Sequence, residues 1–196
     1  MREARKVKAK NTIPLLCAAL LMTTACSDQS DDLTRGYTIP ENFCGTEIDP
    51  REFEPILPPG EELTTEGEVR EMCDSLTSSM HHCTVFVDGK RAFSLDSSPT
   101  DQAESVSGYV SEKGLILDID NPEFTRSGEH GVTTWPSLAI GFSRCAESQF
   151  NDSGIGFALE ASETLGINDA ALLAESLASY MEGRIAQIDP QSCTFT

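Results

Sequence analysis

The chain has 196 residues, of which 14 are lysine or arginine and 32 are aspartate or glutamate, so its formal net charge is −18. This excess of acid argues against nucleic acid and anionic membrane surfaces as partners, because both are themselves negatively charged. The length suits one domain with a substantial hydrophobic core.

The first 25 residues predict an export signal. Five of the first ten residues are basic, and residues 13–25 (IPLLCAALLMTTA) are almost wholly apolar or small. A basic segment, an apolar segment of this length and a final small residue are typical of a secretory signal peptide. Thirteen helical residues rise about 20 Å, less than the ~30 Å hydrocarbon core of a bilayer, so we do not expect a permanent transmembrane helix.

Cys26 directly follows this segment. Thr23-Thr24-Ala25-Cys26 resembles the lipobox of bacterial lipoproteins, in which the cysteine is diacylated and becomes the N-terminus, although that family prefers a branched aliphatic residue where Thr23 stands. Two or three acyl chains hold a protein stably in a bilayer, whereas one does not. We therefore expect a lipid anchor on Cys26 and a location on the outer face of the cell membrane. The alternative is ordinary cleavage and secretion.

Cleavage would make the protein more acidic. Removing residues 1–25 takes away five bases and one acid, which leaves 9 bases and 31 acids and a formal charge of −22. Residues 26–38 are polar and poor in apolar side chains, which predicts a lipidated N-terminus followed by a disordered acidic tether. We expect residues 39–196 to form a single domain.

Two short N-terminal helices are expected. Asp49-Pro50 is typical of a helix start, and Pro58-Pro59-Gly60 would end that helix after Leu57. A second helix is predicted over 66–79, because apolar residues recur at helical spacing: Val69, Met72, Cys73, Leu76 and Met80.

The remaining elements are mostly strands. Asp88-Gly89 predicts a hairpin between strands 83–87 and 91–95. Further strands are expected at 115–119, 137–145 and 155–161, the last two joined by a turn around 151–154. Asn168 is the expected cap of a helix over 169–188. Its packed side would carry Leu173, Leu177, Tyr180, Met181, Arg184 and Ile188, and its wet side Glu175, Ser179, Glu182 and Gln187.

These elements predict an α+β fold. We expect a four- to five-stranded, mostly antiparallel sheet covered on one face by the long C-terminal helix, with short helices near the N-terminus. Trp135 precedes Pro136 and the strand 137–145, where a core or rim position is expected for it.

The cysteines predict a disulfide-stapled domain, because exported proteins fold in an oxidising compartment. If Cys26 is lipidated, an odd number of cysteines remains available for disulfide bonds: Cys44, Cys73, Cys83, Cys145 and Cys193. A Cys145–Cys193 bridge would pin the end of the last helix to the sheet. Cys44–Cys83 would tie the N-terminal segment to the first strand and leave Cys73 free and buried. The alternative for Cys83 is Cys73–Cys83.

Three motifs carry a resemblance to a known group. IPENFCG (39–45), LPPG (57–60) and CTVFVDGK (83–90), with a late helix closed by Cys193, resemble small actinobacterial lipoproteins of unknown function. The resemblance implies an exported, lipid-anchored, disulfide-stapled domain. It carries no catalytic residue over.

No motif predicts a reaction. His81-His82-Cys83 and Cys73 have metal-ligand types, but Cys83 is a disulfide candidate and adjacent histidines on a strand point to opposite faces. The acids around Asp118–Glu123 lack the pattern of a calcium loop. His130 has no nucleophile frame beside it. We therefore expect no catalytic residue, no metal and no cofactor.

The sequence thus favours a binding or interaction module outside the membrane, held by Cys26, which receives a basic protein partner or a small ligand. The first alternative is a structural or accessory envelope lipoprotein without a ligand pocket. A hydrolase is the third hypothesis, and it would require a nucleophile and a base within about 3.2 Å of each other in a cleft.

Overall fold

A computed structural model describes residues 35–69, 80–100, 122–126, 131–148, 154–162, 169–188 and 193–195. At 68–69, 145–148 and 193–195 it describes the backbone only. All of these residues belong to one compact unit, Leu33–Thr196.

The protein is α+β, as predicted, and its main sheet is larger than expected. Seven antiparallel strands follow one another in the order β3-β4-β5-β9-β8-β7-β6, and β10 pairs with the end of β8. Their bounds are β3 Leu63–Val69, β4 His81–Val87, β5 Lys90–Thr100, β6 Phe124–Arg126, β7 Val132–Trp135, β8 Leu138–Ser148, β9 Gly154–Ala161 and β10 Cys193–Phe195. Two short strands, β1 Asn42–Phe43 and β2 Thr46–Glu47, form a separate hairpin.

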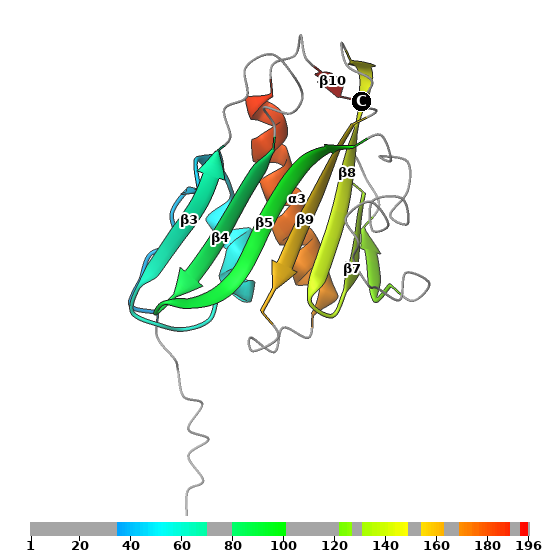
Figure 1. Ribbon diagram of the computed structural model, residues 1–196. Coiled ribbons are helices and arrows are strands. Elements are labelled where there is room, and N and C mark those ends of the chain that lie inside the picture. The colour runs from blue at the N-terminus through cyan, green and yellow to red at the C-terminus, as the bar shows by residue number, and fades with distance from the viewer. Residues whose placement is uncertain are drawn as a thin grey trace, which may run out of the picture. The chain divides into compact units, whose positions relative to one another are not determined.

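One face of the sheet, the inner face, is covered by helix α3 (Ala170–Gln187) and by the N-terminal segment (Figure 1). The N-terminal segment holds β1, β2, helix α1 (Pro50–Phe53) and the 3₁₀ helix η1 (Glu54–Ile56). Four large side chains of α3 are fully buried, Leu173, Leu177, Tyr180 and Met181. Their spacing is the predicted helical stripe, and each contributes roughly 1.5–3 kcal/mol by leaving water.

Three phenylalanines join the N-terminal segment to the sheet. The ring of Phe43 in β1 lies edge-on to Phe53 of α1 at 5.0 Å and to Phe93 of β5 at 5.8 Å. All three rings are fully buried. Edge-to-face contacts at this distance add about 0.5–1.5 kcal/mol to the burial of each pair, so the N-terminal segment is part of the core.

The segment before β1 also belongs to the folded domain. Arg35 Nη2 donates to Leu57 O at 2.8 Å, Gly36 N donates to Gly60 O at 2.7 Å, and the Tyr37 hydroxyl donates to Pro58 O. The predicted tether, residues 26–38, therefore does not extend past residue 34.

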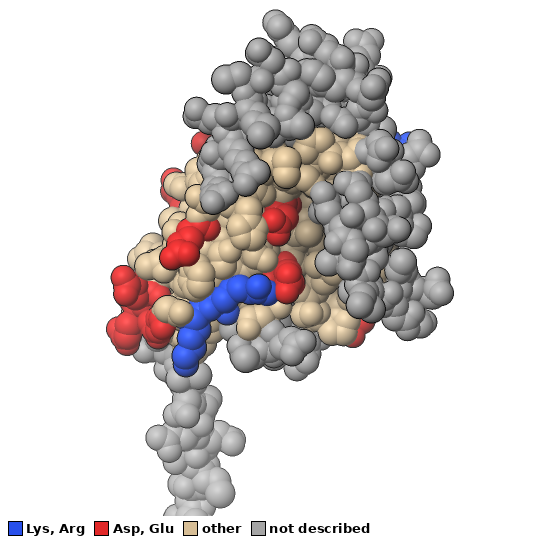
Figure 2. Space-filling model, viewed as in Figure 1, with Lys and Arg blue, Asp and Glu red and all other residues tan. Residues whose placement is uncertain are grey.

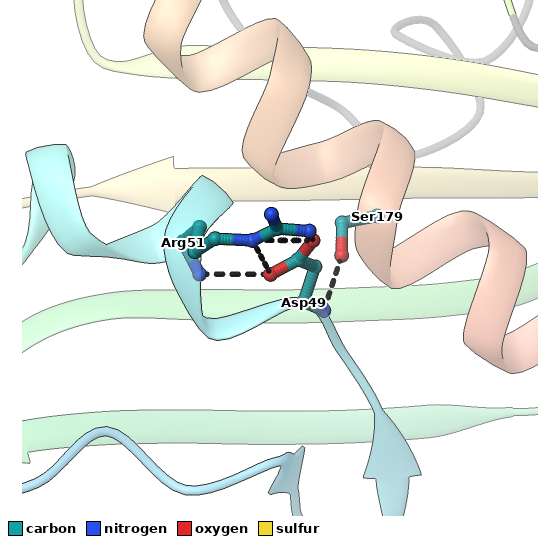
Figure 3. A network of polar contacts seen from close by, with 3 residues as sticks. All are labelled: Asp49, Arg51 and Ser179. Atoms are coloured by element: carbon teal, nitrogen blue, oxygen red, sulfur yellow. Dashed lines mark hydrogen bonds and ion pairs between the residues drawn. The ribbon is translucent and has the colours of Figure 1, made fainter.

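A small polar network links α1 to α3 (Figure 3). Asp49 caps α1 by accepting from Arg51 N at 3.0 Å, and it also binds the Arg51 guanidinium. These contacts to Arg51 lower the pKa of Asp49. The backbone N–H of Asp49 donates to Ser179 Oγ at 2.8 Å. Ser179 is buried, which corrects its expected position on the wet side of the helix.

The hairpin, the long strands and the last helix are confirmed, with shifted ends. Asp88 and Gly89 adopt φ values of 50° and 71°, which a two-residue type I′ turn requires at both central positions. The strands predicted at 137–145 and 155–161 pair as β8 and β9. The cap of α3 is Asp169, whose side chain accepts from Ala171 N, where Asn168 was expected.

The predicted second helix, 66–79, is wrong over the part that can be compared. Residues 63–69 form the edge strand β3, paired to β4 from Leu63↔Val87 to Val69↔His81. Residues 70–79 lie outside the described residues, as does the predicted strand 115–119. Strands β6 and β7 were not expected.

We predict that Gly183→Ala destabilises the protein by about 2–3 kcal/mol. A Cβ at this position on α3 would collide with Glu47 O and lie 3.1 Å from Thr46 Cγ2, and backbone cannot move aside cheaply. Urea denaturation measures the loss. Glu182→Ala, at the adjacent exposed position, is the control and should change stability by less than about 0.5 kcal/mol. Equal stability of the two variants would contradict this packing.

Candidate functional site

The outer face of the sheet, opposite α3, carries a band of polar side chains on its first four strands. Cross-strand register aligns Glu66, Thr84, Ser94 and Glu160 in one row. In the next row, His82 and Asp96 lie between the backbone of position 68 on β3 and the apolar Ala158 on β9. Figure 2 shows this face, with more acidic than basic side chains among the coloured residues. We call the described and at least partly exposed members Glu66, His82, Thr84, Asp96 and Glu160 the polar patch.

His82 is the centre of the polar patch. Its Nδ1 lies 2.6 Å from Asp96 Oδ1, and its Nε2 lies 3.1 Å from Thr84 Oγ1. Because a carboxylate only accepts, Nδ1 carries a proton and donates to Asp96. In the neutral ring Nε2 therefore accepts the Thr84 hydroxyl proton. An acid, an imidazole and a hydroxyl are thus connected in series on an exposed surface.

A basic side chain borders the patch. Arg91 Nη2 lies 2.7 Å from Glu160 Oε1, across from β5 to β9. Both side chains are about half exposed, so the pair contributes little to stability. Its effect is to neutralise one of the acids of the patch.

An apolar cluster adjoins the polar patch on the same face. Trp135, Leu138, Ile140 and Ala158 are all less than 9% exposed, and Phe142 packs against them. Trp135 is therefore a buried anchor, in line with the core or rim position expected for it.

His81 points to the opposite face and has a different environment. Its Nε2 lies 2.9 Å from Cys44 O, and its Nδ1 lies 2.8 Å from Tyr180 Oη. A carbonyl oxygen only accepts, so Nε2 carries the proton and Nδ1 accepts from the tyrosine hydroxyl. The neutral ring is thereby fully hydrogen-bonded between β4, α3 and the β1–β2 turn.

Burial is the main reason that the pKa of His81 is lowered, and the bond to Cys44 O opposes it. The charges of Arg184 and His82 lower it further, and that of Asp96 raises it. Arg184 is itself buried, which lowers its own pKa, and its Nε donates to Ser97 Oγ at 3.4 Å. A second positive charge on His81 is therefore disfavoured.

The disulfide Cys44–Cys83 lies beside His81 and confirms one of the predicted pairings. Its Cα atoms are 5.8 Å apart and 39 residues apart in the chain, for which the chain-entropy model gives about 4 kcal/mol of stabilisation. Gly67 on β3 makes room, since a Cβ there would lie 2.6 Å from Cys44 Sγ. The alternative Cys73–Cys83 pairing is wrong, because Cys83 is bonded to Cys44.

The structure leaves the other sequence-predicted disulfide and anchor positions untested. Cys26, Cys73, His130 and Asp118 lie outside the described residues. The backbones of β10 and β8 pair, with Cys193 opposite Ser148 and Phe195 opposite Cys145. A Cys145–Cys193 bridge stays a prediction.

The metal-ligand types near Cys83 are separated. Cys83 is in a disulfide, and His81 and His82 occupy opposite faces of β4, as their alternation predicted. Among the residues that the structure describes, no three His, Cys, Asp or Glu side chains are grouped as metal ligands would be.

Comparison of the chain with protein-family models, curated proteins and solved structures yields no match. Within the described part of the chain, no helix combines the length and apolar character that a membrane crossing requires.

We predict that His81 makes the folded state less stable as the pH falls. The pKa of His81 in the folded state lies below its value in the unfolded chain, which is near 6.5. The stabilisation that depends on neutral His81 is therefore fully present above that pH. It is lost as the unfolded chain takes up a proton below pH 6.5. Urea denaturation at pH 7.5 and 5 should show a larger loss of stability for the native protein than for His81→Gln.

Tyr180→Phe is the control, because it removes the hydroxyl partner and leaves the imidazole in place. It should keep the pH dependence that His81→Gln reduces. The same change of stability with pH in the native protein and in His81→Gln would contradict the prediction.

Proposed function

We propose that the protein is an exported, lipid-anchored binding module that receives a basic segment of an extracytoplasmic partner on the outer face of its sheet. One observation carries the proposal: the polar patch is solvent-exposed and acidic, whereas the inner face is filled by α3 and the N-terminal segment. The first strands of the sheet therefore present exposed polar side chains to which a partner can bind.

The charges support a basic partner. Glu66 of the patch is exposed, and so are Glu61 and Glu62 before β3 and Asp88 in the β4–β5 turn. Asp88 Oδ1 accepts from both Glu61 N and Glu62 N, so these acids are held together at one end of the sheet. Lys90 and Arg91 are exposed after Asp88, but acids outnumber these bases, and a net negative field attracts a basic segment and speeds its association.

The export signal and the anchor rest on the sequence. The basic N-terminus, the apolar residues 13–25 and Cys26 support secretion followed by lipidation. The resemblance to small actinobacterial lipoproteins supports the same location. A chain that folds outside the cytoplasm also accounts for the Cys44–Cys83 disulfide.

We predict that Cys26→Ser releases the protein from the membrane. Without the thiol no acyl chain is attached, and the precursor is cleaved as a secreted protein or not cleaved at all. Mass spectrometry of the native membrane fraction should show a lipid-modified residue 26 at the N-terminus. An unmodified Cys26 in a released native protein would contradict the anchor and leave the binding proposal intact.

We predict that a photo-reactive residue at Thr64 cross-links to a partner in intact cells. Thr64 is exposed on β3, in line with the polar patch. The matched control is Glu182, which is exposed on α3 on the opposite side of the sheet. Cross-linking from position 64 should fall at least several-fold with Glu66→Lys or at 0.5 M salt, because both weaken attraction to a basic surface.

The cross-linked partner should carry a basic extracytoplasmic segment. Equal cross-linking from positions 64 and 182, or none from either, would contradict the proposal. The second result would favour a structural envelope lipoprotein that has no partner on this face.

A further inference from the structure

We propose that Asp96, His82 and Thr84 form a nucleophilic centre that accepts an acyl group from small activated esters. This activity goes beyond binding of a partner and uses a different property of the polar patch. The observation that carries it is the unbroken series of contacts from carboxylate to imidazole to hydroxyl, 2.6 Å and 3.1 Å long.

The geometry assigns each residue a role. Asp96 accepts from Nδ1 of His82 and so keeps the lone pair of the neutral ring on Nε2. That lone pair faces the Thr84 hydroxyl, which is a weak nucleophile until a base withdraws its proton. Thr84 and His82 are therefore the catalytic residues, and Asp96 is a positioning residue.

His81 and His82 of β4 differ in their hydrogen-bond partners and in their exposure to solvent. Both ring nitrogens of His81 bind protein groups that hold the fold together, Cys44 O and Tyr180 Oη. Those of His82 bind a carboxylate and a side-chain hydroxyl instead, and the His82 and Asp96 side chains are 54% and 42% exposed. The base and its partner are thus accessible from solvent.

The proposed reaction consumes only the ester and one water molecule. Thr84 Oγ1 attacks the ester carbonyl carbon while its proton passes to His82 Nε2. The bond from carbonyl carbon to leaving oxygen then breaks, and His82 returns the proton to the leaving alkoxide or phenoxide. Water repeats the sequence on the acyl-threonine with His82 as base, which releases the carboxylic acid and restores Thr84.

The surroundings of Thr84 indicate the substrate class. Its register neighbours are Glu66 on β3 and the buried Ser94 on β5, and Phe86 follows it on the same face of β4. Phe86 is partly exposed and offers an apolar contact to an acyl or aryl group. Esters of small, uncharged acids fit this setting, whereas the neighbouring acids repel anionic substrates.

The test uses the full chain purified in detergent and p-nitrophenyl acetate as the probe. We expect release of p-nitrophenolate together with an acetyl group on Thr84, found by peptide mass spectrometry. Thr84→Val, which keeps the shape and the β-branch, should abolish acetylation at that peptide, and His82→Gln should slow it at least tenfold. Thr64→Val, on the same face of β3, is the matched control and should react like the native protein.

The positioning role of Asp96 is tested by a measurement that would not change if Asp96 only stabilised the fold. Asp96→Asn should slow acetylation of Thr84 at saturating ester, whereas Asp96→Glu, which keeps a carboxylate at this position, should restore most of the rate. The register partners of His82 are Asp96 on β5 and position 68, a glutamate, on β3. Glu68→Gln should leave the rate within about twofold.

Thermal unfolding shows that each variant is folded before its rate is compared. Acetylation of Thr84 that is unchanged in folded His82→Gln, or acetyl groups on lysine and histidine with none on Thr84, would overturn the proposal. Neither result affects the binding function, because that function is tested by cross-linking at Thr64 in cells.

Discussion

The β1–β2 turn at Cys44 is the constraint on which the rest of the domain depends. Cys44 has a φ of 48° and Gly45 one of 85°, a left-handed backbone that is unfavourable for a residue with a side chain. Three contacts hold Cys44 there: its disulfide to Cys83, the bond from His81 to its carbonyl, and the space left by Gly67. Because these contacts come from β3 and β4, they attach the turn directly to the sheet.

Helix α3 depends on this turn in two ways. Gln187 Nε2 donates to Gly45 O at 2.6 Å, and Gly183 allows close contact with the backbone of Glu47 in β2. The helix therefore packs on a mixed surface, part sheet and part N-terminal hairpin, and its polar side chains Tyr180 and Arg184 lie at the junction of the two. Among the described residues, the inner face is buried against α3 and the N-terminal segment, whereas polar side chains on β3, β4, β5 and β9 of the outer face are exposed.

Much of this fold can be predicted from the sequence, since Asp-Gly turns and long amphipathic helices have strong local signals. Strand β3 has no strong local signal of this kind. For this reason the sequence predicted a helix over 66–79, which overlaps the strand. LTTEGEV contains two glutamates and a glycine that an average strand would lack, and Glu66 and Gly67 each have a tertiary cause. Gly67 makes space for the disulfide, and Glu66 is tolerated because it lies on the polar outer face of an edge strand. Neither cause is visible before the disulfide and the sheet order are known.

The pairing register of β4 with β5 explains why the candidate site could not be predicted from the sequence either. A two-residue turn at Asp88-Gly89 pairs Val87 with Lys90 and Phe86 with Arg91, and continued regularly it would place Leu95 opposite His82. A β-bulge between Val85 and Phe86 shifts the register by one residue, so that Phe93 pairs with Val85 and Asp96 with His82. The bulge allows Phe93 to join Phe43 and Phe53 in the core, and the same shift brings the acid to the histidine. Packing of the inner face therefore determines the polar series on the outer face, and a sequence pattern without the bulge could not reveal it.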